Sequence, residues 1–105
     1  MDYNSITNAV AREAIRSWQQ GDAKKWKSHF AKDAKLYDDG NPRDLVDFST
    51  NVIGTEYFLS FDKIVNGTDI YGHFHTEKWG NFNAYFKFQV NVQGEIIRLD
   101  IGMIK

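Results

Sequence analysis

The chain has 105 residues, which is enough for one domain with a single modest hydrophobic core. Thirteen basic and 14 acidic residues give a formal charge of −1, which argues against a nucleic-acid partner because phosphate backbones select basic surfaces. Cysteine is absent, so disulfides, thiolate nucleophiles and thiolate metal sites are excluded. The N-terminal segment has an early acidic residue and no apolar run, and no stretch reaches membrane-spanning length, so we expect a cytoplasmic protein without a membrane partner.

The first 30 residues have the apolar spacing of two helices. Residues 4–20 predict a helix with Ser5 or Thr7 as its N-cap, and the glycine that follows predicts its end. A second, shorter helix is expected over residues 22–30. Asp22 can cap it by accepting hydrogen bonds from free backbone N–H groups, and the helix would bury one aromatic face and expose its lysines.

A short strand and a third helix complete this half of the chain. Residues 34–38 alternate small or apolar with polar side chains, which is typical of a strand, and Asp39-Gly40 predicts a turn after it. Asn41 followed by Pro42 has the pattern of an N-cap with proline at the first helical position. We therefore predict a third helix that begins at Pro42 and ends at Gly54.

From about residue 56 the apolar period changes from 3.6 to 2, which indicates strands. Residues 57–65 and 69–76 predict two strands joined by an Asn66-Gly67 hairpin turn, and residues 81–92 and 95–104 predict two more. Helices first and strands afterwards predict an α+β fold in which the helices pack on one face of a curved antiparallel sheet.

Strict alternation separates the two faces of the last two strands. The expected core faces consist of Phe82, Ala84, Phe86, Phe88, Val90 and Val92 in one strand and of Ile97, Leu99, Ile101 and Met103 in the next.

Three stretches resemble a known family: SWQQGD at residues 17–22, HFAKDAKLYDDGNP at residues 29–42, and YFKFQVNVQGEIIRLDIG at residues 85–102. They are similar to the nuclear-transport-factor-2-like proteins, a cystatin-like α+β superfamily that includes ketosteroid isomerases and SnoaL-like polyketide cyclases. The resemblance covers nearly all of the chain. It implies one domain over residues 1–105, with three N-terminal helices packed on a curved sheet around a conical pocket. It also implies a homodimer formed through the convex sheet face.

The resemblance makes Asp38 the first candidate for a catalytic residue, because the isomerase base lies at the end of the first strand. Two partners of that base are missing, since Ala14 and Phe86 occupy the positions of the tyrosine and the protonated carboxylic acid that bind the oxyanion. The sequence therefore argues against a steroid isomerase mechanism of that design. In a second interpretation, the Asp38 carboxylate only accepts backbone N–H bonds within the turn.

Tyr71, His73, His75 and Glu77 form a second candidate site, because period 2 places them on one strand face. Two imidazoles at this spacing suit proton transfer or metal binding, and they are also common on exposed or interface surfaces. A two-residue turn at Trp79-Gly80 would direct the histidines into the pocket. A three-residue turn would instead place Tyr71 and both histidines on the convex face.

The resemblance implies a conical pocket, which we expect to bind a small apolar molecule and to support proton transfer of the isomerase, cyclase or dehydratase type. Asp38 would be the base, and Tyr71 or His73 would polarise or reprotonate the substrate. The residues expected to line the pocket are Trp18, Tyr57, His75, Phe86, Phe88 and Met103. We expect no cofactor and no metal. In the alternative, the aromatic side chains fill the cone and the protein is a non-enzymatic ligand-binding or dimerisation module.

Overall fold

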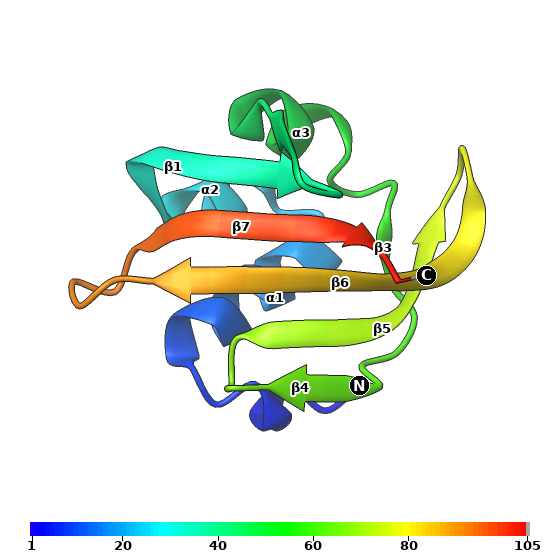
Figure 1. The fold of residues 1–105 in the computed structure, drawn as a ribbon, viewed down its shortest axis with the longest axis horizontal. Coiled ribbons are helices and arrows are strands. Elements are labelled where there is room, and N and C mark those ends of the chain that lie inside the picture. Colours follow the sequence, from blue (N-terminus) through cyan, green and yellow to red (C-terminus); the bar gives the residue numbers. More distant parts are fainter. Residues whose placement is uncertain (105) are drawn as a thin grey trace.

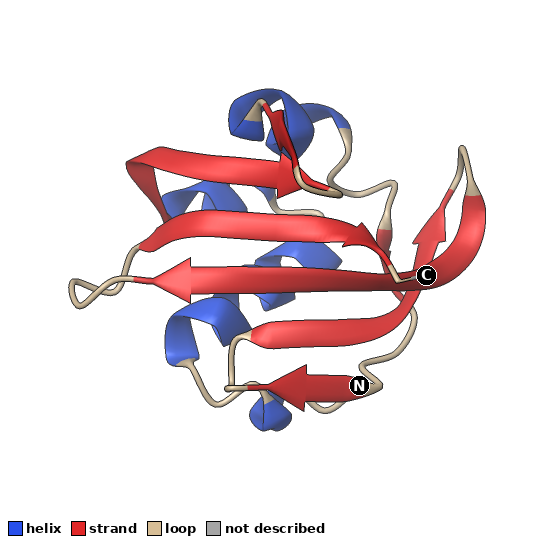
Figure 2. Cartoon of the chain, viewed as in Figure 1, coloured by secondary structure: helices blue, strands red, loops and turns tan. Residues whose placement is uncertain are grey.

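The computed structural model describes residues 1–104 and confirms the α+β class, with three α-helices on one face of a seven-stranded sheet (Figures 1 and 2). The helical elements are η1 (Tyr3–Ser5, a 3-10 turn), α1 (Ala9–Gln19), α2 (Ala23–Ser28) and α3 (Leu45–Asn51). The strands are β1 (Phe30–Asp38), β2 (Asn41–Arg43), β3 (Tyr57–Phe58), β4 (Lys63–Val65), β5 (Asp69–Thr76), β6 (Gly80–Val90) and β7 (Ile96–Met103).

The strands are arranged in the order β2-β1-β7-β6-β5-β3, and β4 also pairs with β5. Neighbouring strands are antiparallel except for β1 and β7, which are parallel. Figure 1 shows that the long β5–β6 hairpin curls at its tip, so the sheet is concave towards the helices.

The first helix begins later than the sequence predicts. Asn8 is its N-cap and accepts a hydrogen bond of 3.0 Å from the Ala11 amide, whereas Ser5 belongs to η1, which Asp2 caps. The predicted cap of α2 is confirmed, because the Asp22 carboxylate accepts a hydrogen bond of 3.1 Å from Lys25 N.

The predicted start of the third helix at Pro42 is wrong. Asn41 and Pro42 form β2, which folds back on β1 through a two-residue turn in which Asp39 and Gly40 have φ angles of 49° and 85°. Such positive φ angles suit a hairpin that matches the twist of its strands. Helix α3 is capped instead by Asp44, which accepts a hydrogen bond of 2.8 Å from Asp47 N.

The predicted strand over residues 57–65 is interrupted, and β3 and β4 are its two ends. The segment between them stays attached to β5, since Leu59 N and Asp62 N donate hydrogen bonds of 2.8 Å each to the carbonyls of His73 and Tyr71. The bounds of β5 and the turn at Asn66-Gly67 are as predicted.

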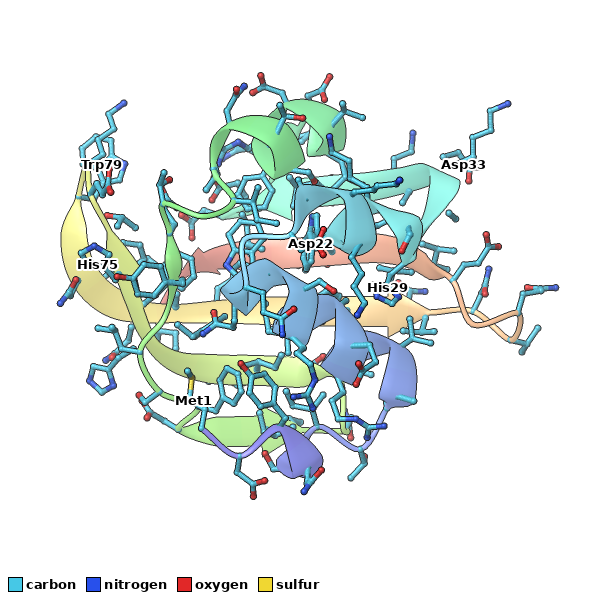
Figure 3. The ribbon with its side chains drawn as sticks, turned by 180° about the vertical axis from the view of Figure 1, so that it is seen from behind. Met1, Asp22, His29, Asp33, His75 and Trp79 are labelled. Carbon is cyan, nitrogen blue, oxygen red and sulfur yellow. The ribbon has the colours of Figure 1, made fainter. Side chains whose placement is uncertain are left out.

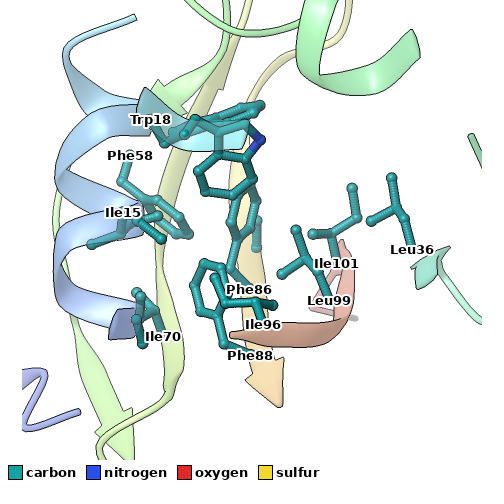
Figure 4. Packing of buried hydrophobic residues seen from close by; sticks show 14 of the residues in the cluster. Ile15, Trp18, Leu36, Phe58, Ile70, Phe86, Phe88, Ile96, Leu99 and Ile101 are labelled. Atoms are coloured by element: carbon teal, nitrogen blue, oxygen red, sulfur yellow. The ribbon is translucent and has the colours of Figure 1, made fainter. Parts of the chain in front are cut away.

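An aromatic cluster between the helices and the sheet forms the core (Figure 4). The Trp18 ring stacks on Phe48 at 5.1 Å between centroids and meets the edge of Phe86 at 5.3 Å. In the expected core faces, Ala84, Phe86, Phe88, Leu99 and Ile101 are buried.

Three residues predicted on the core faces, Val92, Ile97 and Met103, lie outside the core. Val92 is 98% exposed because the chain has already turned at Asn91, whose side chain accepts hydrogen bonds from Gln93 N and Glu95 N. Met103 is 42% exposed at the far end of β7. A register shift between Gln89 and Val90 pairs Val90 with Ile96, and Ile96 is fully buried.

Candidate functional site

A cavity of about 480 Å³ lies between α3 and the concave face of the sheet, near the curled end of the β5–β6 hairpin. Its apolar wall consists of Phe48, Val52, Phe74, Phe82, Ala84, Phe86, Ile101 and Met103. Its polar and charged residues include Asp38, Asp39, Arg43, Glu56, Thr76 and Lys78. The cavity therefore combines an aromatic interior with ionisable groups, as ligand sites commonly do.

Asp38 lines this cavity as one member of an ion pair. Arg43 Nη1 donates a hydrogen bond of 2.8 Å to Asp38 Oδ2, and both side chains are about one-third exposed, at 38% for Arg43 and 35% for Asp38. The β1–β2 hairpin sets this contact, and the Arg43 guanidinium also lies 4.8 Å from the centre of the Phe48 ring. The neighbouring Asp39 makes the backbone contact, because its Oδ1 accepts a hydrogen bond of 3.2 Å from Met103 N.

Glu56 reaches the cavity from the loop between α3 and β3. Its amide donates to the Val52 carbonyl at 3.3 Å, which fixes the loop against the end of α3. The side chain is half-buried, and burial raises the pKa of the Glu56 carboxyl above its usual value of 4.5. Arg43 and His75 act in the opposite direction on this pKa, while the Asp38 charge raises it further.

The hairpin between β5 and β6 forms the remaining edge of the cavity, with a three-residue loop over residues 77–79. Thr76 Oγ1 fixes this loop, because it accepts a hydrogen bond of 2.8 Å from Trp79 N and donates one of 2.9 Å to the Gly80 carbonyl. The Trp79 ring lines the cavity yet is 70% exposed at the hairpin tip (Figure 3).

This three-residue loop decides between the two orientations that the sequence left open. Phe74 pairs with Phe82, and Thr76 with Gly80, so the even-numbered side chains of β5 face the cavity. Tyr71, His73 and His75 therefore point away from Phe74, and none of them lines the cavity that Asp38 lines. The expectation that these three residues meet Asp38 in one pocket is corrected by the register.

Each of the three residues has partners outside the cavity. His73 Nδ1 lies 2.9 Å from Asp62 Oδ2 and 3.2 Å from Ser60 Oγ, and His73 is exposed. His75 Nδ1 lies 2.7 Å from the Asn81 side-chain oxygen, and its ring centre is 5.1 Å from that of Tyr57 (Figure 3). The Tyr71 ring faces Tyr85 at 6.3 Å.

The other predicted ligand contacts divide into two groups. Phe86 and Met103 line the cavity. The other three, Trp18, Phe88 and Tyr57, do not line the cavity. Trp18 and Phe88 are buried elsewhere in the core, and Tyr57 lies on the edge strand β3 beside His75.

Sequence reasoning missed Arg43 and Glu56. A signal for Arg43 existed, because a two-residue turn at Asp39-Gly40 pairs Asp38 with Asn41 and brings the following residues back alongside β1. Glu56 lies in a loop with no periodicity, and no signal in the sequence placed it near Asp38.

The described residues contain no group of three or more His, Cys, Asp or Glu side chains that could hold a metal ion. None of the helices within residues 1–104 has the length and apolar character needed to cross a membrane.

The convex sheet face carries a row of aromatic and basic side chains. The Arg98 guanidinium lies 4.1 Å from the Tyr37 ring centre and donates two hydrogen bonds, of 2.8 and 3.0 Å, to Asp100. Lys87 Nζ lies 4.9 Å from the Tyr85 ring centre. A homodimer formed through this face stays a prediction.

The sequence matches no protein-family model and no curated protein. Solved structures resemble it closely in backbone. An NTF2-like protein of unknown function from Cytophaga hutchinsonii superposes with a TM-score of 0.71 at 12% identity, over 93% of this chain and 89% of that one. The chain has the NTF2-like fold. The resemblance that the sequence predicted is therefore confirmed at the level of the fold.

Two further similar structures belong to proteins whose names refer to a reaction or a bound molecule. A candidate ketosteroid isomerase from Kribbella flavida has a TM-score of 0.73 and 13% identity, over 95% of this chain and 78% of that one. The orange carotenoid protein of Anabaena (Nostoc) sp. PCC 7120, solved with bound canthaxanthin, has a TM-score of 0.73 and 17% identity. Our chain is covered to 92% in that match but spans only 36% of the carotenoid protein.

Proposed function

We propose that this protein binds a small, mainly apolar molecule in the cavity between α3 and the β5–β6 hairpin. The observation that carries the proposal is the cavity of about 480 Å³ with an aromatic wall, which reaches Asp38. Ligand pockets typically measure about 300–1,000 Å³ and are mostly apolar with a few polar groups. A volume in this range favours a binding protein over a cone filled by its own side chains.

The structural relatives support the same class of ligand. The structure of the orange carotenoid protein is described as binding canthaxanthin, and the name of the Kribbella flavida protein refers to a ketosteroid substrate. Both names refer to largely hydrocarbon molecules with oxygen at the periphery. The cavity of this chain has the corresponding division, with Phe74, Phe82 and Phe86 in its wall and Asp38 and Arg43 at its polar side.

A substitution that fills the cavity tests the proposal. Ala84 is 3% exposed and lines the cavity, so Ala84→Leu adds three carbon atoms to the wall. The larger side chain occupies space that the ligand needs. We therefore expect the affinity for Prodan, a fluorescent naphthalene ketone, to fall by about tenfold or more, which corresponds to about 1.4 kcal/mol. Fluorescence titration measures the affinity.

Asn83→Leu is the matched control, because Asn83 is the neighbouring residue on β6 and is exposed on the opposite face. It should leave Prodan binding unchanged. The proposal is wrong if the wild-type protein does not bind Prodan, or if Ala84→Leu, folded by circular dichroism, binds it as well as wild type.

Proton transfer by Asp38 is the second candidate function, and the position of Asp38 in the cavity wall favours it. In this reaction the Asp38 carboxylate would take a proton from the carbon next to a ligand carbonyl, and the resulting enolate would regain a proton from solvent. In D2O, the CH2 group beside the Prodan carbonyl would therefore exchange its protons for deuterons. We expect Asp38→Asn to slow this exchange by about 100-fold, the lower range for a general base.

Proton NMR of the CH2 signal measures the exchange. Asp62→Asn is the control, because Asp62 pairs with His73 and does not line the cavity. Equal exchange rates in Asp38→Asn and wild type would exclude Asp38 as the base, and would leave the binding proposal intact.

A further inference from the structure

A groove of about 460 Å³ runs along the free edge of β1, outside the cavity. Its walls come from β1, β2 and the first residues of α3, and include Lys32, Lys35, Pro42, Leu45 and Val46. Among residues 1–104, Arg43 is the one residue that lines both this groove and the cavity. We call it the β1 groove.

The β1 groove exists because β2 covers only part of β1. The strand β2 has three residues and pairs with residues 36–38, whereas β1 begins at Phe30. On its other side, β1 pairs with β7 at Phe30 and again from Lys35, with a register shift between the two. Within the described part of the chain, residues 31–34 therefore have no ladder partner on either side. Figure 1 shows β1 at the edge of the sheet, with α3 beside only its C-terminal half.

The groove carries positive charge that the protein itself does not neutralise. Lys32 and Lys35 are exposed, and neither forms an ion pair within residues 1–104. Asp33, which lies between them in the sequence, does not line the groove. Arg43 is already ion-paired across the β1–β2 hairpin, and the Asp44 carboxylate accepts a hydrogen bond from the first turn of α3. Lysines at a sheet edge discourage neutral strands, so the partner that fits is one with carboxylates.

We propose that the β1 groove binds an extended, acidic peptide segment of a partner protein, which adds to the sheet beside residues 31–34. The main chain of the segment pairs with the uncovered main chain of β1, as when a peptide extends a sheet edge. Its carboxylates lie near Lys32 and Lys35. An apolar side chain of the segment covers Val46, which is 67% exposed at the start of α3. This binding does not depend on the cavity or its ligand.

The probe is a fluorescein-labelled peptide that alternates glutamate and valine, because valine favours an extended chain. Anisotropy titration of wild type should show saturable binding that weakens as the salt concentration rises. In the complex, the amides of residues 31–34 should exchange their hydrogens more slowly. Lys32→Glu/Lys35→Glu should weaken the binding by about tenfold or more, since repulsion replaces attraction at two positions.

Two controls separate strand addition from a general attraction between charges. Lys24→Glu/Lys63→Glu changes the net charge equally, but these exposed lysines lie on α2 and β4 and do not line the groove. This variant should bind the peptide within about twofold of wild type, because salt screens distant charges. A peptide with the same side chains and alternate N-methylated amides lacks half of the main-chain donors. It should bind about tenfold more weakly.

The inference is wrong if wild type does not bind the alternating peptide, or if the peptide does not slow the exchange of residues 31–34. Equal binding of the N-methylated peptide would also overturn it, and so would an equal loss in the two double variants, because the surface would then recognise charge alone. Both variants replace exposed side chains, so their circular dichroism should match that of wild type. None of these outcomes bears on Prodan binding in the cavity.

Discussion

Replacement of Phe86 by alanine should destabilise the protein by about 3–5 kcal/mol, the range for truncating a buried aromatic residue. Phe86 is 2% exposed and lies where the helices, the sheet and the cavity wall meet. Its ring contacts five other aromatic rings with centroids between 5.1 and 6.4 Å away, those of Trp18, Trp26, Phe58, Phe74 and Phe88. A small domain has about 5–15 kcal/mol of stability in total, so the loss is a large share of it.

Urea unfolding followed by tryptophan fluorescence measures this effect, because Trp18 and Trp26 lie in the same cluster. Gln89→Ala is the control on the same strand, since Gln89 is exposed, and it should change stability by no more than about 0.5 kcal/mol. A loss below about 1 kcal/mol for Phe86→Ala would mean that the surrounding rings close the space. The wall of the cavity would then be deformable, in contradiction to a preformed site.

The alternation of side chains predicted the strand faces well, because burial in a sheet follows a period of two whatever the long-range topology. Residues 69–76 are therefore a strand with the predicted bounds, and Phe74, Ala84 and Phe86 lie on its inner face or that of its neighbour. The histidine orientation depended on one further fact, the number of residues in the hairpin loop. Trp79-Gly80 allows two turn lengths, and only the observed pairing of Thr76 with Gly80 distinguishes them.

Local signals failed where a neighbouring element competed for the same residues. Asn41-Pro42 has the pattern of a helix start, yet the positive φ angles of Asp39 and Gly40 turn the chain back onto β1 before any helix can begin. The same turn brings Arg43 to Asp38, so the misassigned helix start also concealed the ion pair. The position of Glu56 depends on how its loop packs against the end of α3. Such packing is a tertiary contact, and no periodic pattern in the sequence indicates it.

Gly72→Ala should be the second severe substitution, with a loss of about 2–4 kcal/mol from overpacking together with weakened hydrogen bonds. A Cβ atom at Gly72 would overlap the Ser60 carbonyl oxygen and would lie 3.3 Å from Phe58 Cδ1. The Ser60 oxygen belongs to the backbone and cannot rotate away. The segment between β3 and β4 would have to move, at the expense of the bonds from Leu59 N and Asp62 N to β5.

Gly94→Ala separates this clash from the general cost of replacing glycine. Gly94 has a φ of 81°, and its added Cβ would meet only Val10 Cγ2 at 3.8 Å, so the substitution carries conformational strain of about 1–2 kcal/mol without a backbone clash. Hydrogen exchange should show faster exchange of the Leu59 and Asp62 amides in Gly72→Ala and unchanged exchange in Gly94→Ala. If both glycine variants show equal stability and equal exchange at Leu59 and Asp62, the close approach of Ser60 to β5 does not limit the position of this segment.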